Sequence, residues 1–142
     1  MLTTIEKVLF LLRAPVTADA STDALSRLAA IAPELEVEHG GRLFAVGDTP
    51  DSVYVVLDGA IRIEGIEVPS RLAGAGELIG GLALFGTPAH QATATAVVSS
   101  RVLKIDREEL QALLDEDGEF ARALFSGLLR ALSVLAPAAL VM

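Results

Sequence analysis

The feature that most constrains the fold is a change of hydrophobic period close to Pro33. Before this proline, apolar residues recur at helical spacing over residues 3–12 and 22–31. Over residues 34–105 they alternate with polar residues in short runs that are separated by turn residues, which is typical of half-buried strands. Helical spacing returns from Asp106 to the end of the chain. About eight short strands at this close spacing predict a closed β-sandwich or barrel with helices before and after it.

Two local signals place turns and helix starts within this pattern. The dipeptide Asp58-Gly59 separates two apolar runs and predicts a tight hairpin, because glycine tolerates the positive φ that such turns need. Asp106 is a good helix N-cap, and Glu109 lies three residues later as its partner in a capping box.

Composition bounds the class of protein. The 142 residues are 52% hydrophobic and suffice for one domain with a sizeable core. No apolar run reaches the roughly 20 residues that span a bilayer, so we expect no membrane span. The absence of cysteine excludes a disulfide framework and thiolate metal sites. We therefore expect a cytoplasmic protein.

The charge argues against nucleic-acid binding and against catalysis. The net charge is −8, and the 11 basic residues are scattered rather than clustered. One tyrosine and no tryptophan offer little surface for stacking on bases. With two histidines and no cysteine, neither a nucleophilic triad nor a metal site is well supplied, so we expect no enzyme and no metal.

The segment GELIGGLALFGTPAHQATATA, residues 76–96, has the pattern of an anion site. Gly80-Gly81 stands before the apolar residues 82–84, where a helix N-terminus could direct free N–H groups at a phosphate. The alternative is that these glycines serve only the geometry of a turn.

The order of these pieces resembles the cyclic-nucleotide-binding domain family. The matching segments are LFAVGDTPDSVYVVLDGAIRI, AGAGELIGGLALFGTP with ATATA, and VLKIDREELQALL, and the resemblance runs from about residue 5 to 134. It implies an eight-stranded jelly roll, mainly β, with N-terminal helices at 1–33, the roll at 34–105 and a C-terminal helix pair at 106–142. These three parts would form one domain over residues 1–142. It also implies a bacterial regulatory protein whose ligand lies against a phosphate-binding cassette and whose hinged last helix reports occupancy.

This chain departs from the family at both charged anchors of the cassette. The family pattern places a Glu, which binds the ribose hydroxyl, where this chain has Gly81. It places an Arg, which pairs with the cyclic phosphate, where this chain has His90, or Gln91 if the loop is shifted by one residue. The candidate ligand-binding residues carried over from the motif are Gly80, Gly81, Leu82, Ala83, His90, Gln91, Ala92 and Thr93. Without a guanidinium, any cyclic nucleotide or other anion should bind weakly, and no cofactor is expected.

Other interpretations of the charged residues stay beside this one. His90 is either a pH-dependent anion contact or an exposed loop residue next to Pro88, and we favour the exposed residue. Arg71 could supply the missing charge, although a solvated strand end is the commoner role. Glu77 could bond a sugar hydroxyl, although a charge at the rim is the simpler interpretation.

The last helix carries a wide apolar stripe that predicts a partner. The residues expected to form the dimer or partner surface are Leu124, Leu128, Leu132 and Leu135. Such a stripe suits a two-fold homodimer through residues 118–135, or docking on a larger protein.

Two functions follow from the sequence. The leading one is a non-enzymatic regulatory or assembly module related to cyclic-nucleotide-binding domains that does not bind cyclic nucleotides in the usual way. The alternative is a small-molecule sensor that binds a cyclic nucleotide or another ligand in the roll and signals through the last helix. We expect no helix-turn-helix module after residue 142, although a fragment whose effector domain lies elsewhere remains a third possibility.

Overall fold

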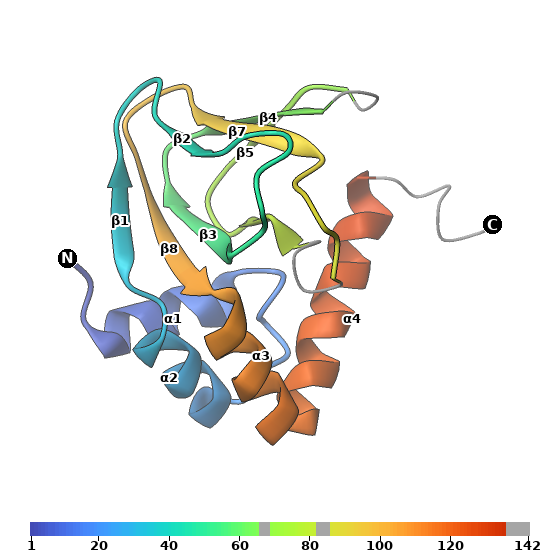
Figure 1. Ribbon diagram of the computed structural model, residues 1–142. Coiled ribbons are helices and arrows are strands. Elements are labelled where there is room, and N and C mark those ends of the chain that lie inside the picture. The colour runs from blue at the N-terminus through green and yellow to red at the C-terminus, as the bar shows by residue number, and fades with distance from the viewer. Residues whose placement is uncertain (66–68, 82–85, 136–142) are drawn as a thin grey trace.

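The computed structural model describes residues 1–65, 69–81 and 86–135, with side chains up to residue 131. Its helices are α1 (Thr4–Arg13), α2 (Thr22–Ala30), α3 (Arg107–Glu116) and α4 (Gly118–Leu135). Its strands are β1 (Glu34–Val37), β2 (Arg42–Phe44), β3 (Ser52–Asp58), β4 (Ile61–Gly65), β5 (Arg71–Ala73), β6 (Leu78–Ile79), β7 (Ala92–Ala96) and β8 (Ser100–Asp106). The order of helices and strands is the one that the hydrophobic period predicts (Figure 1).

The helix starts are fixed by local hydrogen bonds. Thr3 caps α1 in a capping box, because its hydroxyl accepts from the Glu6 N–H and the Glu6 carboxylate accepts from the Thr3 N–H. Asp106 caps α3 as expected, accepting from the Glu109 N–H at 3.0 Å. The reciprocal bond from the Glu109 side chain, which a full capping box requires, is not formed. Asp117 accepts from the Phe120 N–H at the start of α4. This bond lowers the pKa of the Asp117 carboxyl, and the ion pair with Arg27 acts in the same direction.

The strands form two antiparallel sheets that face each other as a jelly roll. One sheet has the order β1-β8-β3-β6 and the other the order β2-β7-β4-β5. Successive strands therefore seldom pair with each other, and most ladders join segments far apart in the sequence. The expected eight-stranded jelly roll with flanking helices is confirmed.

The predicted hairpin at Asp58-Gly59 is wrong. β3 and β4 lie in different sheets, since β3 pairs with β6 and β8 while β4 pairs with β5 and β7. Gly59 has a φ of +98°, so the dipeptide does form a tight turn, but the turn carries the chain from one sheet to the other. The Ser100 side chain packs where a Cβ of residue 59 would lie, and its hydroxyl accepts from the Ala60 N–H.

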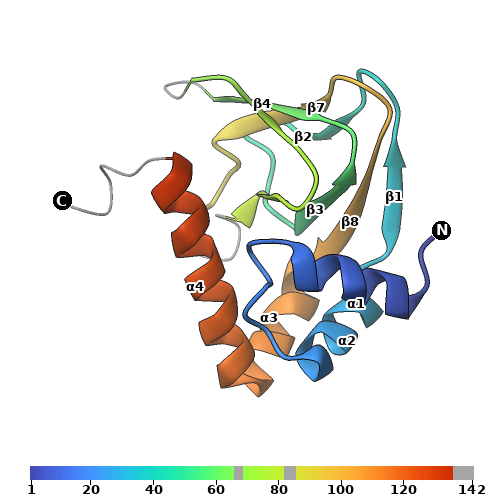
Figure 2. The same cartoon turned by 180° about the vertical axis from the view of Figure 1, so that it is seen from behind.

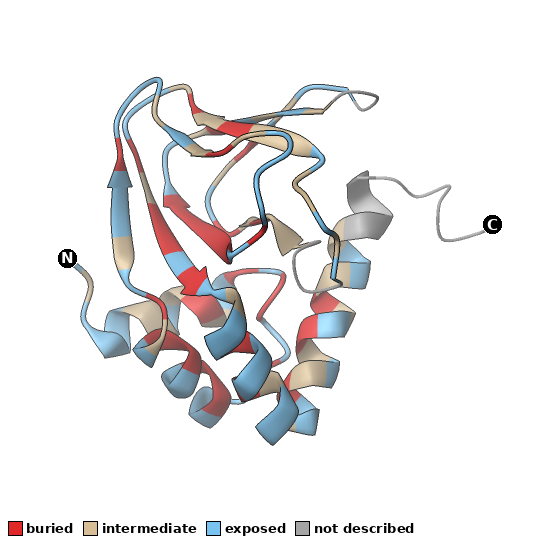
Figure 3. Ribbon diagram, in the orientation of Figure 1, coloured by how far each residue is buried: buried red, intermediate tan, exposed pale blue. Residues whose placement is uncertain are grey.

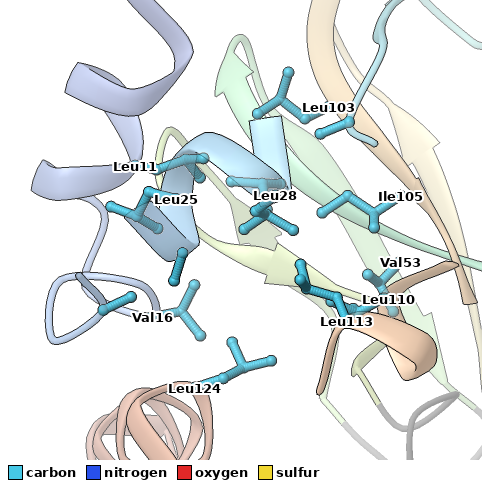
Figure 4. Close-up of a cluster of buried hydrophobic side chains, with 14 of the residues drawn as sticks. Leu11, Val16, Leu25, Leu28, Val53, Leu103, Ile105, Leu110, Leu113 and Leu124 are labelled. Carbon is cyan, nitrogen blue, oxygen red and sulfur yellow. The ribbon is translucent and has the colours of Figure 1, made fainter. Parts of the chain in front are cut away.

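The core has two parts that share β3. Val53, Val55 and Leu57 face the helices, whereas Tyr54 and Val56 face the interior of the roll. The first part gathers apolar side chains from α1, α2, α3 and α4 onto the β3 and β8 face (Figure 4). Burial is accordingly densest on β3, β8 and the inner sides of the helices (Figure 3). The apolar run of β3 is explained by burial on both of its faces.

α4 rises from the helical base along the side of the roll (Figure 2). Phe120 and Leu124 enter the helix-facing part of the core. Further along, Arg130 pairs with Asp19 at 2.6 Å and donates to the Pro15 carbonyl at 3.0 Å. These contacts tie α4 to the loop that follows α1. Within the described part of the chain, no helix is long and apolar enough to cross a bilayer.

Candidate functional site

A cavity of about 470 Å³ lies between the roll and α4. The part of its wall that comes from the roll and its loops consists of Phe44, Pro50, Ile63, Arg71, Leu78, Ile79, Gly80, Gly81, Thr87, Ala89, His90, Gln91 and Ala92. The wall that comes from α4 consists of Phe125, Leu128, Leu129 and Ala131. The last helix is thus part of the cavity itself.

The structure brings most of the candidate cassette residues together. Gly80, Gly81, His90, Gln91 and Ala92 all line the cavity. Thr93 does not, because its side chain turns toward the loop after β2. There its hydroxyl accepts from the backbone N–H of residue 46 at 3.0 Å. Leu82 and Ala83, with the short helix expected there, lie outside the described residues.

His90 stacks flat on Phe44. The ring centroids are 3.7 Å apart and the ring planes differ by 9°. The backbone holds the stack in place, since the His90 N–H donates to the Asp48 carbonyl and the His90 carbonyl accepts from the Gly47 N–H. The expectation that His90 is an exposed loop residue is therefore wrong: it is partly buried and forms part of the cavity wall.

The charge state of His90 follows from this position. Burial lowers the pKa of the His90 imidazole below its ordinary value, although the carboxylates of Asp48 and Asp51 act in the opposite direction. The imidazole is consequently neutral at pH 7. At one of the two places where the sequence pattern would put the family's arginine, the cavity therefore presents an uncharged stacked ring. Gln91, the other candidate for this place, is exposed and also lacks a charge.

Side chains of the cavity wall lie close to the backbone of both Gly80 and Gly81. A Cβ at Gly80, which has a φ of +80°, would lie 3.6 Å from the His90 ring and 3.5 Å from the Phe44 ring. A Cβ at Gly81 would lie 3.1 Å from Leu78 Cδ2 and 3.7 Å from Leu128 Cδ2. Gly81, which the sequence pattern aligns with the family's glutamate, is thus bordered by two leucines, one of them from α4.

The environment of Arg71 differs from the one expected from the sequence, which favoured a solvated arginine at a strand end. Its side chain is 34% exposed and lines the cavity, and its Nη1 donates to Glu77 Oε1 at 2.9 Å. The second carboxylate oxygen of Glu77 accepts from the Gly74 N–H at 2.6 Å. The carboxylate of Glu77 therefore fixes Arg71 at the cavity wall.

The sequence pattern does not mark Phe44 and Phe125, the two phenylalanines that line the cavity, as site residues. Phe44 ends a short strand, and Phe125 belongs to the broad stripe of the last helix, so each resembles an ordinary core residue. The only available signal was the width of that stripe, which exceeds what a helix needs to pack on one face. Within the described residues, no group of three carboxylate or histidine side chains could hold a metal ion.

A sequence model of the family described as "Cyclic nucleotide-binding domain" matches residues 34–117, which is more than half of the chain. The chain belongs to the cyclic nucleotide-binding domain family. The match begins with β1 and ends just before α4, so it covers the whole jelly roll and α3.

The relatives of known structure include domains of transcriptional regulators. The N-terminal domain of a transcriptional regulator from Streptomyces coelicolor is 30% identical with a TM-score of 0.72, and the match covers 91% of this chain and 96% of that one. The sensor domain of the transcriptional regulator DNR from Pseudomonas aeruginosa shares the fold at 21% identity, with a TM-score of 0.72 and coverage of 91% and 92%.

A curated relative is the CRP-like cAMP-activated global transcriptional regulator of Mycobacterium tuberculosis, which is 24% identical over 127 residues. The match covers 86% of this chain and 57% of the regulator, so the chain spans little more than half the length of this relative. The chain thus has the fold of the regulatory domains of this family.

Proposed function

We propose that this chain is a non-enzymatic regulatory module of a cytoplasmic bacterial protein, in which the position of α4 depends on the state of the cavity. We further propose that the module does not bind cyclic nucleotides through the charged anchors that the family uses. The single observation that carries both proposals is the contact zone around Gly81, where Leu128 of α4 borders the place of the missing glutamate.

The energetic argument concerns the two missing anchors. A hydrogen bond to a charged group contributes about 1.5–3 kcal/mol. The loss of two such bonds lowers affinity by roughly two to four decades. Neither the neutral His90 ring nor the backbone at Gly81 replaces a guanidinium or a carboxylate. A cyclic nucleotide would therefore bind far more weakly than a site with both anchors allows.

The regulatory argument concerns α4. One side of the helix forms a wall of the cavity, through Phe125 and Leu128, and contributes Leu124 to the core. A ligand that fills the cavity must therefore contact α4, and it favours whichever position of the helix offers the better contacts. A movement of α4 would also move the exposed apolar side chains of Phe125 and Leu129, and a bound partner protein would respond to that change.

Cyclic AMP and cyclic GMP test the proposal directly. Each nucleotide is titrated to millimolar concentration at pH 6 and pH 8 while the melting temperature is measured. A ligand at about one hundred times its Kd stabilises a protein by roughly 2.7 kcal/mol, which shifts the melting temperature of a small domain by several degrees. We expect no such shift with the wild-type chain at either pH. A saturable shift at micromolar nucleotide would overturn the proposal.

A gain-of-function variant is the matched positive control. Gly81→Glu combined with His90→Arg restores both anchors of the family pattern, and Leu128→Ala makes room for the longer side chain at residue 81. We expect this triple variant to bind a cyclic nucleotide more tightly than Leu128→Ala alone. Equal binding by the two would show that the anchors are not what the site lacks.

The proposed partner is a second copy of the chain, through α4. The observation in favour is that Phe125 and Leu129, one turn apart, remain 52% and 39% exposed in the single chain. Of the residues expected at this surface, Leu124 is buried in the chain's own core and Leu128 lines the cavity, while the side chains of Leu132 and Leu135 lie outside the described residues. Phe125 and Leu129 also line the cavity, so a dimer through α4 would use the parts of these two side chains that remain exposed beside it.

A further inference from the structure

The lining of the cavity has an unusual balance of apolar and charged groups. Leu78 of β6 and Phe125 and Leu128 of α4 contribute apolar side chains to its wall. Among the described residues that line it, Arg71 is the only one with a permanent charge, and none is acidic. A site of this composition suits a ligand that is mostly apolar and carries at most one negative charge.

The geometry around Arg71 defines where that charge would lie. Glu77 occupies Nη1 of the guanidinium and is itself held by the backbone of Gly74, so the arginine is oriented before any ligand arrives. A guanidinium carries five N–H donors, so others remain for a second carboxylate. The Arg71–Glu77 pair also limits the ligand to one anionic group, because Glu77 already balances part of the positive charge of Arg71.

The size and the remaining polar groups narrow the class further. A volume of about 470 Å³ lies within the range of about 300–1,000 Å³ that is usual for small-molecule sites. The neutral His90 ring lies flat against Phe44 and offers an aromatic surface rather than a second cation. The second charge of a phosphate monoester therefore finds no cation, whereas an apolar chain or ring finds matching apolar side chains.

We propose that the cavity binds an apolar monocarboxylate, whose carboxylate pairs with Arg71 and whose apolar body lies between β6 and α4. This inference rests on the proposed function, because it names the ligand class of the same cavity. The apolar body would contact Leu128 and Phe125 directly, so that binding draws α4 toward the roll.

The experiment compares three probes on the full 142-residue chain. Octanoate carries both features, octan-1-ol has the apolar body without the charge, and acetate has the charge without the body. Binding is measured by calorimetry and by NMR shifts of the α4 amides. We expect saturable octanoate binding, octan-1-ol binding at least about fivefold weaker, and no acetate binding. Equal affinity for octanoate and octan-1-ol would overturn the role of the charge, and no saturable octanoate binding would overturn the ligand class.

Variants separate Arg71 from general charge effects. Arg71→Gln should lower octanoate affinity about tenfold and leave octan-1-ol affinity unchanged. Glu77→Gln should raise octanoate affinity, because the amide keeps an oxygen that can accept from Arg71 but removes the negative charge that balances the guanidinium. Arg62→Gln is the matched control, since Arg62 is an exposed arginine of β4 that does not line the cavity. Equal effects of Arg71→Gln and Arg62→Gln, or weaker octanoate binding by Glu77→Gln, would contradict the proposal.

The outcome for octanoate is independent of the nucleotide titration. Absence of octanoate binding together with absence of nucleotide binding overturns only the ligand class. Tight nucleotide binding overturns the proposed function itself.

Discussion

Gly127 of α4 lies directly against the carbonyl group of Val16. A Cβ at residue 127 would overlap the carbonyl oxygen, so only glycine permits this approach of the helix to the loop after α1. Arg130 reaches the same loop one turn later, through Asp19 and Pro15. The position of α4, and with it one wall of the cavity, thus depends on the absence of a side chain at residue 127.

Gly127→Ala should displace α4. Alanine in a helix interior is ordinarily favoured over glycine by about 1 kcal/mol, so the sign of the effect is diagnostic. We expect a loss of about 1–3 kcal/mol in the free energy of unfolding from the steric overlap, and faster amide hydrogen exchange in α4. Gly118→Ala is the control, because a Cβ at Gly118 meets nothing within 4 Å. A stabilised Gly127→Ala variant would contradict this account of the contact.

Gly59→Ala tests the crossing between the two sheets. The substitution forces a side chain into a φ of +98° and into the space of Ser100. We expect a loss of about 2–4 kcal/mol in the free energy of unfolding, measured by denaturant titration. Gly40→Ala isolates the conformational part, since Gly40 has a φ of +86° with nothing within 4 Å of a Cβ. Equal losses of unfolding free energy in the two variants would mean that the Ser100 side chain moves aside at no energetic cost.

His90 should make the stability of the fold sensitive to mild acid. Because burial lowers the pKa of the folded imidazole, the unfolded chain takes up a proton more readily, with a pKa of about 6.5. The contribution of His90 to the free energy of unfolding is therefore fully present above pH 6.5. It is lost as the pH falls toward the pKa of the imidazole in the folded protein. His90→Phe keeps an aromatic ring against Phe44 but cannot titrate.

The measurement is the melting temperature of both proteins between pH 8 and pH 5.5. We expect the wild-type chain to lose stability relative to His90→Phe as the pH falls. The exposed His39 provides the control, and His39→Phe should retain the acid sensitivity of the wild-type chain. A constant difference between wild type and His90→Phe across this range would be the contrary result.

The exposed face of α4 predicts self-association. At tens of micromolar, sedimentation should show a dimer for the wild-type chain. The double variant Phe125→Glu with Leu129→Glu should be monomeric, because charges would enter an apolar interface. The circular dichroism of the β-roll should be unchanged in this variant, and Ala112→Glu, which places the same charge at an exposed position of α3, should remain dimeric. A monomeric wild-type chain would count against the dimer.

The sequence by itself determined the features that depend on neighbours in the chain. The cap that Asp106 forms on the Glu109 N–H joins residues three apart, so their spacing predicts the contact. The change from helical to alternating period predicted the order of elements for the same reason. The cassette pattern was also local, and the residues Gly80, Gly81 and His90 that it marked line one cavity.

Only the tertiary structure decided the features that depend on distant pairing. Asp58-Gly59 looks like a hairpin turn because the sequence does not reveal that β3 and β4 belong to different sheets. His90 looks exposed until β7 lies beside β2 and brings the imidazole onto Phe44. The apolar stripe of α4 serves two purposes, since Leu124 packs in the core and Leu128 lines the cavity near Gly81. The sequence does not show which residue of the stripe serves which purpose. Burial is a property of the assembled sheets and helices, and for this reason local spacing could not predict it.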